Sequence, residues 1–138
     1  MIVADTSAII ALIDADDRHH TAMVRLFEAD PAAWILPWAI LPEVDYLLSR
    51  HVSAHAAEAF SGDVAEGAFE IEWGDSQDLR RAQLLRAQYA DLHLGLVDSV
   101  VAAIAERLGA KAIATLDLRD FGAMELVGQP QLWPRDAV

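Results

Sequence analysis

Four acidic side chains lie beside apolar segments of this 138-residue chain, where a carboxylate is costly to accommodate. They are Asp5, Glu43, Asp98 and Asp117. Each has an ordinary explanation when taken singly, because acids cap helices, suit the first turn of a helix and occur in turns. Crowded together, however, carboxylates repel one another unless a cation neutralises them. Oxygen ligands alone favour a hard ion, so the pattern predicts a Mg²⁺ or Mn²⁺ site.

Hydroxyl side chains accompany two of these acids. Thr6 and Ser7 follow Asp5 directly, and their hydroxyls are also suited to capping a helix that begins there. Thr115 lies two residues before Asp117, which places both side chains on the same face of a strand. We therefore expect these three hydroxyls to be polar neighbours of the carboxylates.

Two of the acids have rivals nearby in the sequence. Asp120 competes with Asp117, which we favour because it ends the apolar run, whereas Asp120 is expected in the adjoining loop. Asp45 competes less well with Glu43, because two positions along a helix lead to nearly the opposite face.

Short apolar runs alternate with amphipathic stretches, which predicts strands alternating with helices. Strands are expected at residues 2–4, 34–36, 69–73 and 112–116, with an edge strand at 132–133. Helices are expected at 6–13, 18–29, from Pro42 onward, 53–66, 75–89 and 96–108, and a loop at 116–120. Continuously apolar strands indicate a mainly parallel sheet covered on both faces, an α/β sandwich that binds ligands at the carboxyl ends of its strands. Asp5 and Asp117 should both lie at that edge.

The composition is acidic and lacks cysteine. The 10 basic and 22 acidic residues give a net charge of −12, which argues against a protein that holds nucleic acid by bulk electrostatics. Disulfides and thiolate sites are excluded. The start lacks a basic signal region, and prolines and acids interrupt the most apolar stretch, residues 35–48. We expect one soluble, cytoplasmic domain spanning residues 1–138, with no membrane contact.

Four short motifs resemble those of a known family, and they occur in the family's order along nearly the whole chain. They are Val-Ala-Asp5-Thr6-Ser7-Ala, Pro42-Glu43-Val44, Leu96-Val97-Asp98 and Ala114-Thr115-Leu116-Asp117-Leu118-Arg119-Asp120-Phe121. Each is weak alone, but together they look like a PIN domain and, more narrowly, like the VapC toxins of bacterial toxin–antitoxin pairs.

The resemblance implies a PIN-like α/β/α sandwich and a Mg²⁺- or Mn²⁺-dependent endoribonuclease that inhibits translation. Asp5, Glu43, Asp98 and Asp117 become its catalytic acids, with Thr115 as a polar neighbour. Asp5, Asp98 and Asp117 are also its metal ligands. A metal held there would activate water for attack on an RNA phosphodiester, in transfer or ribosomal RNA. The implied partner is a VapB-type antitoxin, and numerous apolar and aromatic residues favour a homodimer.

Basic residues that could guide phosphate groups are few. The candidates are Arg80, Arg86 and Arg119, with Arg50, Arg81 and Arg107 as further ones. The alternative for the arginines of residues 75–89 is a merely solvated helix face.

Two rival functions remain to be weighed. A haloacid-dehalogenase-like phosphatase also carries an Asp after its first strand, but its Asp-x-Asp motif is replaced here by Asp5-Thr6-Ser7. The other rival is a catalytically inactive PIN-like or receiver-like module that binds protein partners. Dependence of RNA cleavage on Asp5 would distinguish the nuclease from such a module.

Overall fold

A parallel five-stranded sheet forms the centre of the computed structural model, which describes residues 1–137. Its spatial order is β3-β2-β1-β4-β5. The strands are β1 (Ile2–Ala4), β2 (Trp34–Pro37), β3 (Glu70–Glu72), β4 (Ala112–Ala114) and β5 (Gln131–Trp133). In the central register Val3 pairs with Ile35 on one side and with Ile113 on the other. The predicted α/β fold with a mainly parallel sheet is confirmed.

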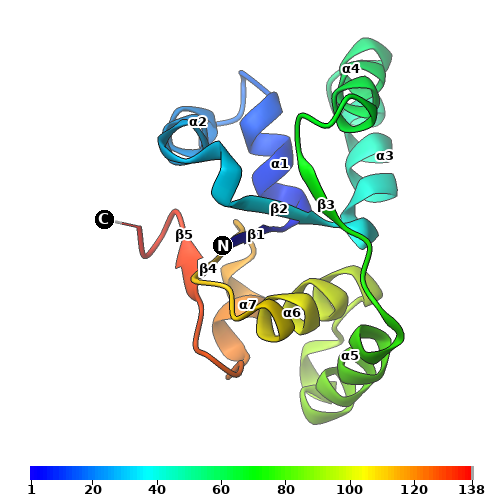
Figure 1. Ribbon diagram of the computed structural model, residues 1–138, viewed down its shortest axis with the longest axis vertical. Helices are drawn as coiled ribbons and strands as arrows, with labels where there is room; N and C mark the ends of the chain where they lie inside the picture. Colours follow the sequence, from blue (N-terminus) through cyan, green and yellow to red (C-terminus); the bar gives the residue numbers. More distant parts are fainter. Residues whose placement is uncertain (138) are drawn as a thin grey trace.

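Helices cover both faces of this sheet. They are α1 (Thr6–Ile13), α2 (His20–Ala29), α3 (Leu41–His51), α4 (Ala54–Ala65), α5 (Ser76–Gln88), α6 (Leu96–Leu108) and α7 (Leu118–Ala123). Short 3₁₀ turns occur at η1 (Pro31–Ala33), η2 (Trp38–Ile40) and η3 (Ala90–Leu92). Figure 1 shows α1–α4 on one side of the sheet and α5–α7 on the other, so the architecture is an α/β/α sandwich. No helix within residues 1–137 has the length and apolar character needed to cross a bilayer.

The core lies on both faces of the three central strands, against α1 and α3 on one side and α6 on the other. Every residue of β1, β2 and β4 is buried, as continuously apolar sequences of a covered parallel sheet should be. Helix α6 buries the unbroken stretch from Ser99 to Ala105 and contacts β1 and β2. A helix buried on so many sides is held firmly, and this fixes where its first turn stands relative to the strand ends.

The structure corrects one local expectation and decides between two alternatives at another place. Residues 116–120 do not form a loop alone, because Asp117 caps helix α7 by accepting the backbone N–H of Asp120 at 3.1 Å, while Phe121 in the same helix is buried. The side-chain cap of α1 is Asp5 itself rather than Thr6 or Ser7. In both places an acid that follows a strand begins the next helix.

The order of the strands reverses direction between β1 and β4. The chain passes outward from β1 to β2 and β3, and later from β4 to β5 on the opposite side. In parallel sheets such a switch point leaves a crevice outside the carboxyl ends of the two strands, where ligands bind. Asp5 directly follows β1, and Thr115 directly follows β4.

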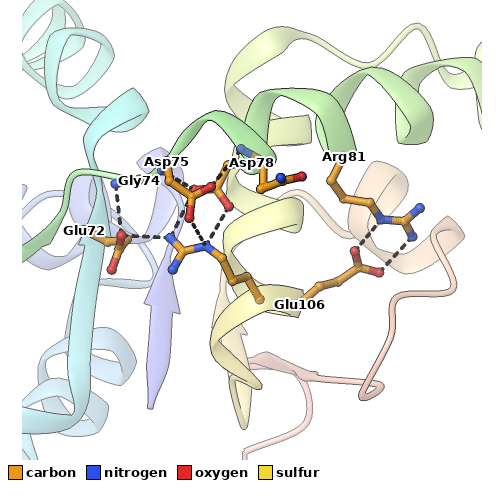
Figure 2. A network of polar contacts seen from close by, with 8 residues as sticks. Glu72, Gly74, Asp75, Asp78, Arg81 and Glu106 are labelled. Carbon is orange, nitrogen blue, oxygen red and sulfur yellow. Dashed lines mark hydrogen bonds and ion pairs between the residues drawn. The ribbon is translucent and has the colours of Figure 1, made fainter.

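An ion-pair network fastens α5 and β3 to the end of α6. Arg107 donates to both carboxylate oxygens of Asp78, at 2.7 and 3.0 Å, and to Glu72 at 2.8 Å (Figure 2). Arg81 pairs with Glu106 alongside it, at 2.6 Å.

The turn before α5 requires a glycine at position 74. The φ of Gly74 is +79°, and a Cβ there would lie 2.8 Å from the indole nitrogen of Trp38.

Candidate metal centre

The four predicted acids surround one cavity of about 290 Å³ at the carboxyl edge of the sheet. Asp5 reaches it from the end of β1, Glu43 from the first turn of α3, Asp98 from the first turn of α6 and Asp117 from the cap of α7. Thr6, Ser7 and Leu47 complete its lining. Four elements that are distant in the sequence therefore bring these carboxylates together. Asp45, the rival of Glu43, is exposed and does not line the cavity.

Asp5 is the most deeply placed of the four, with an exposed fraction of 3%. One carboxylate oxygen accepts the backbone N–H of Thr6 at 2.8 Å. The other accepts the hydroxyl of Thr115 at 2.8 Å and that of Ser7 at 3.3 Å. These contacts fix the orientation of the carboxylate, because its two oxygens accept from donors in α1 and in the residue after β4.

The hydroxyls of Ser7 and Thr115 also hold the segment that follows β4, and Ser7 ties that segment to the first turn of α1. Ser7 Oγ accepts the backbone N–H of Leu116 at 2.9 Å, and Thr115 Oγ1 accepts that of Asp117 at 3.0 Å. The third predicted hydroxyl behaves differently, since the buried Thr6 Oγ1 has no hydrogen-bond partner within residues 1–137. The supporting role is thus carried by Ser7 and Thr115, while Thr6 contributes its backbone.

Asp120 lies closer to the centre than its expected loop position implies. One carboxylate oxygen each from Asp98, Asp117 and Asp120 lie within 4.8 Å of one another. The buried Oδ1 of Asp120 has no hydrogen-bond partner among the described residues. Asp98 and Asp117 thus belong to both the close trio and the cavity lining. Asp120 belongs to the trio alone, and Asp5 and Glu43 belong to the lining alone. The spacing of three residues after a capping Asp is the sequence signal that could have placed Asp120 in the first turn of a helix.

Crowding and burial make two of the acids weak. Burial raises the pKa of Asp5 from 3.8 to about 6, although hydrogen bonds from Thr115, the Thr6 backbone and Ser7 oppose the shift. Burial also raises the pKa of Asp98 from 3.8 to about 7, helped by the negative charges of its carboxylate neighbours. Those neighbours are Asp5, Asp117, Asp120 and Glu43. A cation among these carboxylates would offset their repulsion and favour their ionised forms at neutral pH.

The residues present fit a divalent metal ion. Within residues 1–137, no basic side chain forms an ion pair with any of the five acids. The donor set contains only oxygen, with no histidine or cysteine in the close trio or the cavity lining. That chemistry suits Mg²⁺ or Mn²⁺ rather than zinc.

The arginines proposed to guide phosphate differ in their surroundings. Arg107 and Arg81 both belong to the ion-pair network, so their charges are already paired with carboxylates. Arg80 and Arg86 are exposed on α5, and Arg119 is exposed on α7, two residues after Asp117. Arg50 is exposed near the end of α3.

Comparison with known proteins gives a consistent assignment. A relative from Mycobacterium tuberculosis, ribonuclease VapC26, is 28% identical over 127 residues, which cover 92% of this chain and 94% of the relative. The structure of VapC20 from the same organism, a sarcin-ricin loop cleaving toxin, has a TM-score of 0.81 and 24% identity, covering 93% of this chain and 98% of that one. DNA-bound VapBC from Salmonella typhimurium has a TM-score of 0.72 and 19% identity, covering 95% of each chain. The family model described as PIN domain matches residues 2–125, and the chain therefore belongs to the PIN-domain family.

Proposed function

We propose that this protein is a metal-dependent endoribonuclease toxin of the VapC type, which hydrolyses phosphodiester bonds of RNA. The observation that carries the proposal is the group of carboxylates around one cavity at the switch point of the sheet. Membership of the PIN-domain family and the relative named ribonuclease VapC26 support it. The net charge of −12 agrees with a nuclease whose affinity for phosphate depends on its metal.

The residues proposed to hold Mg²⁺ or Mn²⁺ are Asp98, Asp117 and Asp5, and we add Asp120 because its carboxylate lies beside the first two. A bound divalent cation supplies the positive charge that activates water and neutralises a phosphate. Asp5 is oriented for this task by Thr115 and Ser7.

Glu43 is proposed to accept the proton of the attacking water. It lines the cavity, and once Asp5 and the close trio are assigned to the metal, its carboxylate is the one left for proton transfer. Glu43→Gln would then reduce the rate of RNA cleavage without abolishing metal binding. Cleavage assays measure the first property, and the rise in melting temperature with Mn²⁺ measures the second.

The test uses the purified protein and RNA with Mg²⁺, with Mn²⁺ or with EDTA. Asp5→Asn is expected to lower the cleavage rate by about 100-fold or more, because it removes a positioned charge from the reacting centre. Asp45→Asn is the matched control, since this acid is exposed outside the cavity, and its rate should equal that of the wild type. Undiminished cleavage by Asp5→Asn, or cleavage that survives EDTA, would overturn the proposed metal mechanism, whereas no cleavage by the wild type would favour the inactive binding module.

Three finer features are part of the same proposal. A VapB-type antitoxin is the proposed partner, because the similar folds include a VapBC complex. A homodimer is proposed from large exposed apolar side chains such as Tyr46, Trp73 and Leu84. The proposed location is the cytoplasm, where the RNA is. Co-purification with the product of an adjacent reading frame tests the first feature, and light scattering at micromolar concentration, which should not give a monomer, tests the second.

A further inference from the structure

A second cavity of about 310 Å³ adjoins the metal centre along the segment that follows β4. Its walls come from three parts of the chain: Leu116 and Leu118, Arg18 and His19 in the loop between α1 and α2, and Pro134 and Arg135 after β5. Its volume lies near the lower end of the range for small-ligand pockets, roughly 300–1,000 Å³.

Thr115 joins this cavity to the metal centre. It lines the second cavity, and its hydroxyl donates to Asp5 in the first. Leu118 likewise follows Asp117 directly in the chain. A strand of RNA with its scissile phosphate at the carboxylates would therefore bring a neighbouring nucleotide to the second cavity.

The cavity offers apolar surface together with a cation. Most of its surface comes from carbon, contributed by Leu116, Leu118 and Pro134 among others. Arg18 is exposed, its Nε donates to His19 Nε2 at 3.1 Å, and no carboxylate within residues 1–137 forms an ion pair with its guanidinium. Its terminal nitrogens thus have donors to offer a ligand.

The loop that carries Arg18 is shaped by its own acids. Asp17 accepts the backbone N–H of His19 at 2.8 Å, and Asp14 accepts that of Asp16 at 3.0 Å. These carboxylates are used to hold the turn and do not line the cavity. The cation at the opposite wall, Arg135, is paired with Asp136 at 2.8 Å, so Arg18 supplies the available positive charge.

We propose that this cavity is a nucleotide subsite that takes the RNA base next to the scissile phosphate. Single-stranded RNA is recognised by packing its unstacked bases against apolar side chains and guanidinium planes, and both are present here. The base would pack on Leu116, Leu118 and Pro134, with Arg18 stacking on it or contacting its phosphate. The inference rests on the proposed ribonuclease function.

A cavity of about 350 Å³ beside α7 and β5 is less suitable for RNA. Its basic residue is the already paired Arg135, and the acidic Glu125 also lines it. A phosphate there would meet a neutralised cation and a negative charge, so the available charge favours the cavity of Arg18.

The experiment compares two substrates with Mn²⁺ present: a mixed-sequence pool of single-stranded oligoribonucleotides and bis(p-nitrophenyl) phosphate, which has no base. Arg18→Gln and Leu118→Asn are expected to raise KM for the oligoribonucleotides by about tenfold, the loss typical of one stacked base. Their kcat, and their turnover of bis(p-nitrophenyl) phosphate, should equal those of the wild type. Arg25→Gln is the matched control, because Arg25 is exposed on α2 and does not line the cavity.

Each outcome is decisive. Unchanged KM in both variants overturns the subsite while the ribonuclease function stands. Equal losses on both substrates also overturn it, since they indicate general damage to the metal centre. Unchanged KM with weaker antitoxin binding would identify a protein-binding site instead. If the wild type cleaves no RNA, the proposed function fails first, and the subsite falls with it. Both variants lie at exposed positions, and melting curves verify that they are folded.

Discussion

The two ends of helix α6 carry acids in opposite electrostatic surroundings. At its first turn, Asp98 stands among Asp117 and Asp120 without a basic partner in the described part of the chain. At its last turn, Glu106 is paired with Arg81, and Arg107 is paired with acids from other elements. The same helix thus begins in a cluster of uncompensated acids and ends in a network of paired charges. Figure 2 shows the network at its end.

The pKa values of the acids follow this difference. Burial raises the pKa of Glu106, but hydrogen bonds from Arg81 and the backbone of Val127 outweigh burial and lower it below 4.5. Burial of Asp98 is reinforced rather than opposed by its neighbours, which is why its pKa rises to about 7. The hydrogen bonds from Arg107 to Asp78 and Glu72 raise the pKa of that guanidinium above its usual value.

The helix dipole alone does not account for the contrast. It favours an acid at the first turn and a base at the last, but by only about 0.3–1 kcal/mol each. Five acids at one edge of the sheet cost more than this in the absence of metal. Glu106, at the last turn of α6, is paired with arginine, whereas Asp98, at the first turn, is left for a cation to pair.

The largest expected difference comes from replacing one acid at each end of α6 by its amide. Asp98→Asn should lower RNA cleavage by about 100-fold or more, yet stabilise the metal-free protein by about 1–2 kcal/mol, a value discounted for its partial exposure. Glu106→Gln should keep cleavage at the wild-type rate but destabilise the protein by about 1–3 kcal/mol, because Arg81 loses its charged partner. Urea unfolding in EDTA and cleavage assays measure both. Destabilisation by Asp98→Asn would contradict the contrast.

An intermediate loss of stability is expected when an acid of the ion-pair network around Arg107 is removed. Asp78→Ala should lower the free energy of unfolding by about 2–4 kcal/mol, since this buried carboxylate accepts two bonds from Arg107 and also the backbone N–H of Asp75. Asp75→Ala, at a more exposed side chain that mainly caps α5, should cost about 1 kcal/mol. Denaturant unfolding compares the two. Similar small losses would mean that the network contributes little, while cleavage per folded molecule should be unchanged in both.

The smallest effect concerns pH. Asp5 and Asp98 have pKa values of about 6 and about 7 in the folded protein, above the ordinary 3.8, so the folded state binds protons more readily than the unfolded state. The metal-free protein should therefore gain about 2 kcal/mol, a value discounted for the partial exposure of Asp98, as the pH falls from about 8 to about 5, and lose it again on raising the pH. Glu106 acts in the opposite sense, but only below pH 4.5.

Melting curves in EDTA check this dependence, with Asp98→Asn as the control that removes its larger part. Saturating Mn²⁺ should raise the melting temperature at pH 8 more than at pH 5, because protons and metal compete for the same oxygens. A wild-type melting temperature that falls between pH 8 and pH 5 in EDTA would argue against the crowded site.

Local signals were enough to predict much of the fold. Helix α6 has its expected bounds, because an apolar helical sequence ends at Gly109, whose φ of +60° suits glycine. The central strands were found because covered parallel strands are continuously apolar. The edge strand β5 was found from Leu132 and Trp133 alone.

The parts that were missed depend on contacts between distant residues. The ion pair of Arg107 with Asp78 spans 29 positions and that with Glu72 spans 35, so no local pattern distinguishes Arg107 from an exposed arginine. The helix after Asp117 was missed because its six residues carry little periodicity, and its stability comes from the buried Phe121. The sequence did not predict a role for Arg18, because only the fold brings its loop to the segment after β4.

The hydrogen bond between Asp5 and Thr115 joins residues 110 positions apart. The carboxylate of Asp5 leaves the ribosome before the hydroxyl that orients it has been synthesised. Non-local pairing of this kind also forms slowly during folding. A growing chain, or one truncated before β4, contains no complete centre. The proposed chemistry is thus available only after the segment that follows β4 has been made and has packed beside β1.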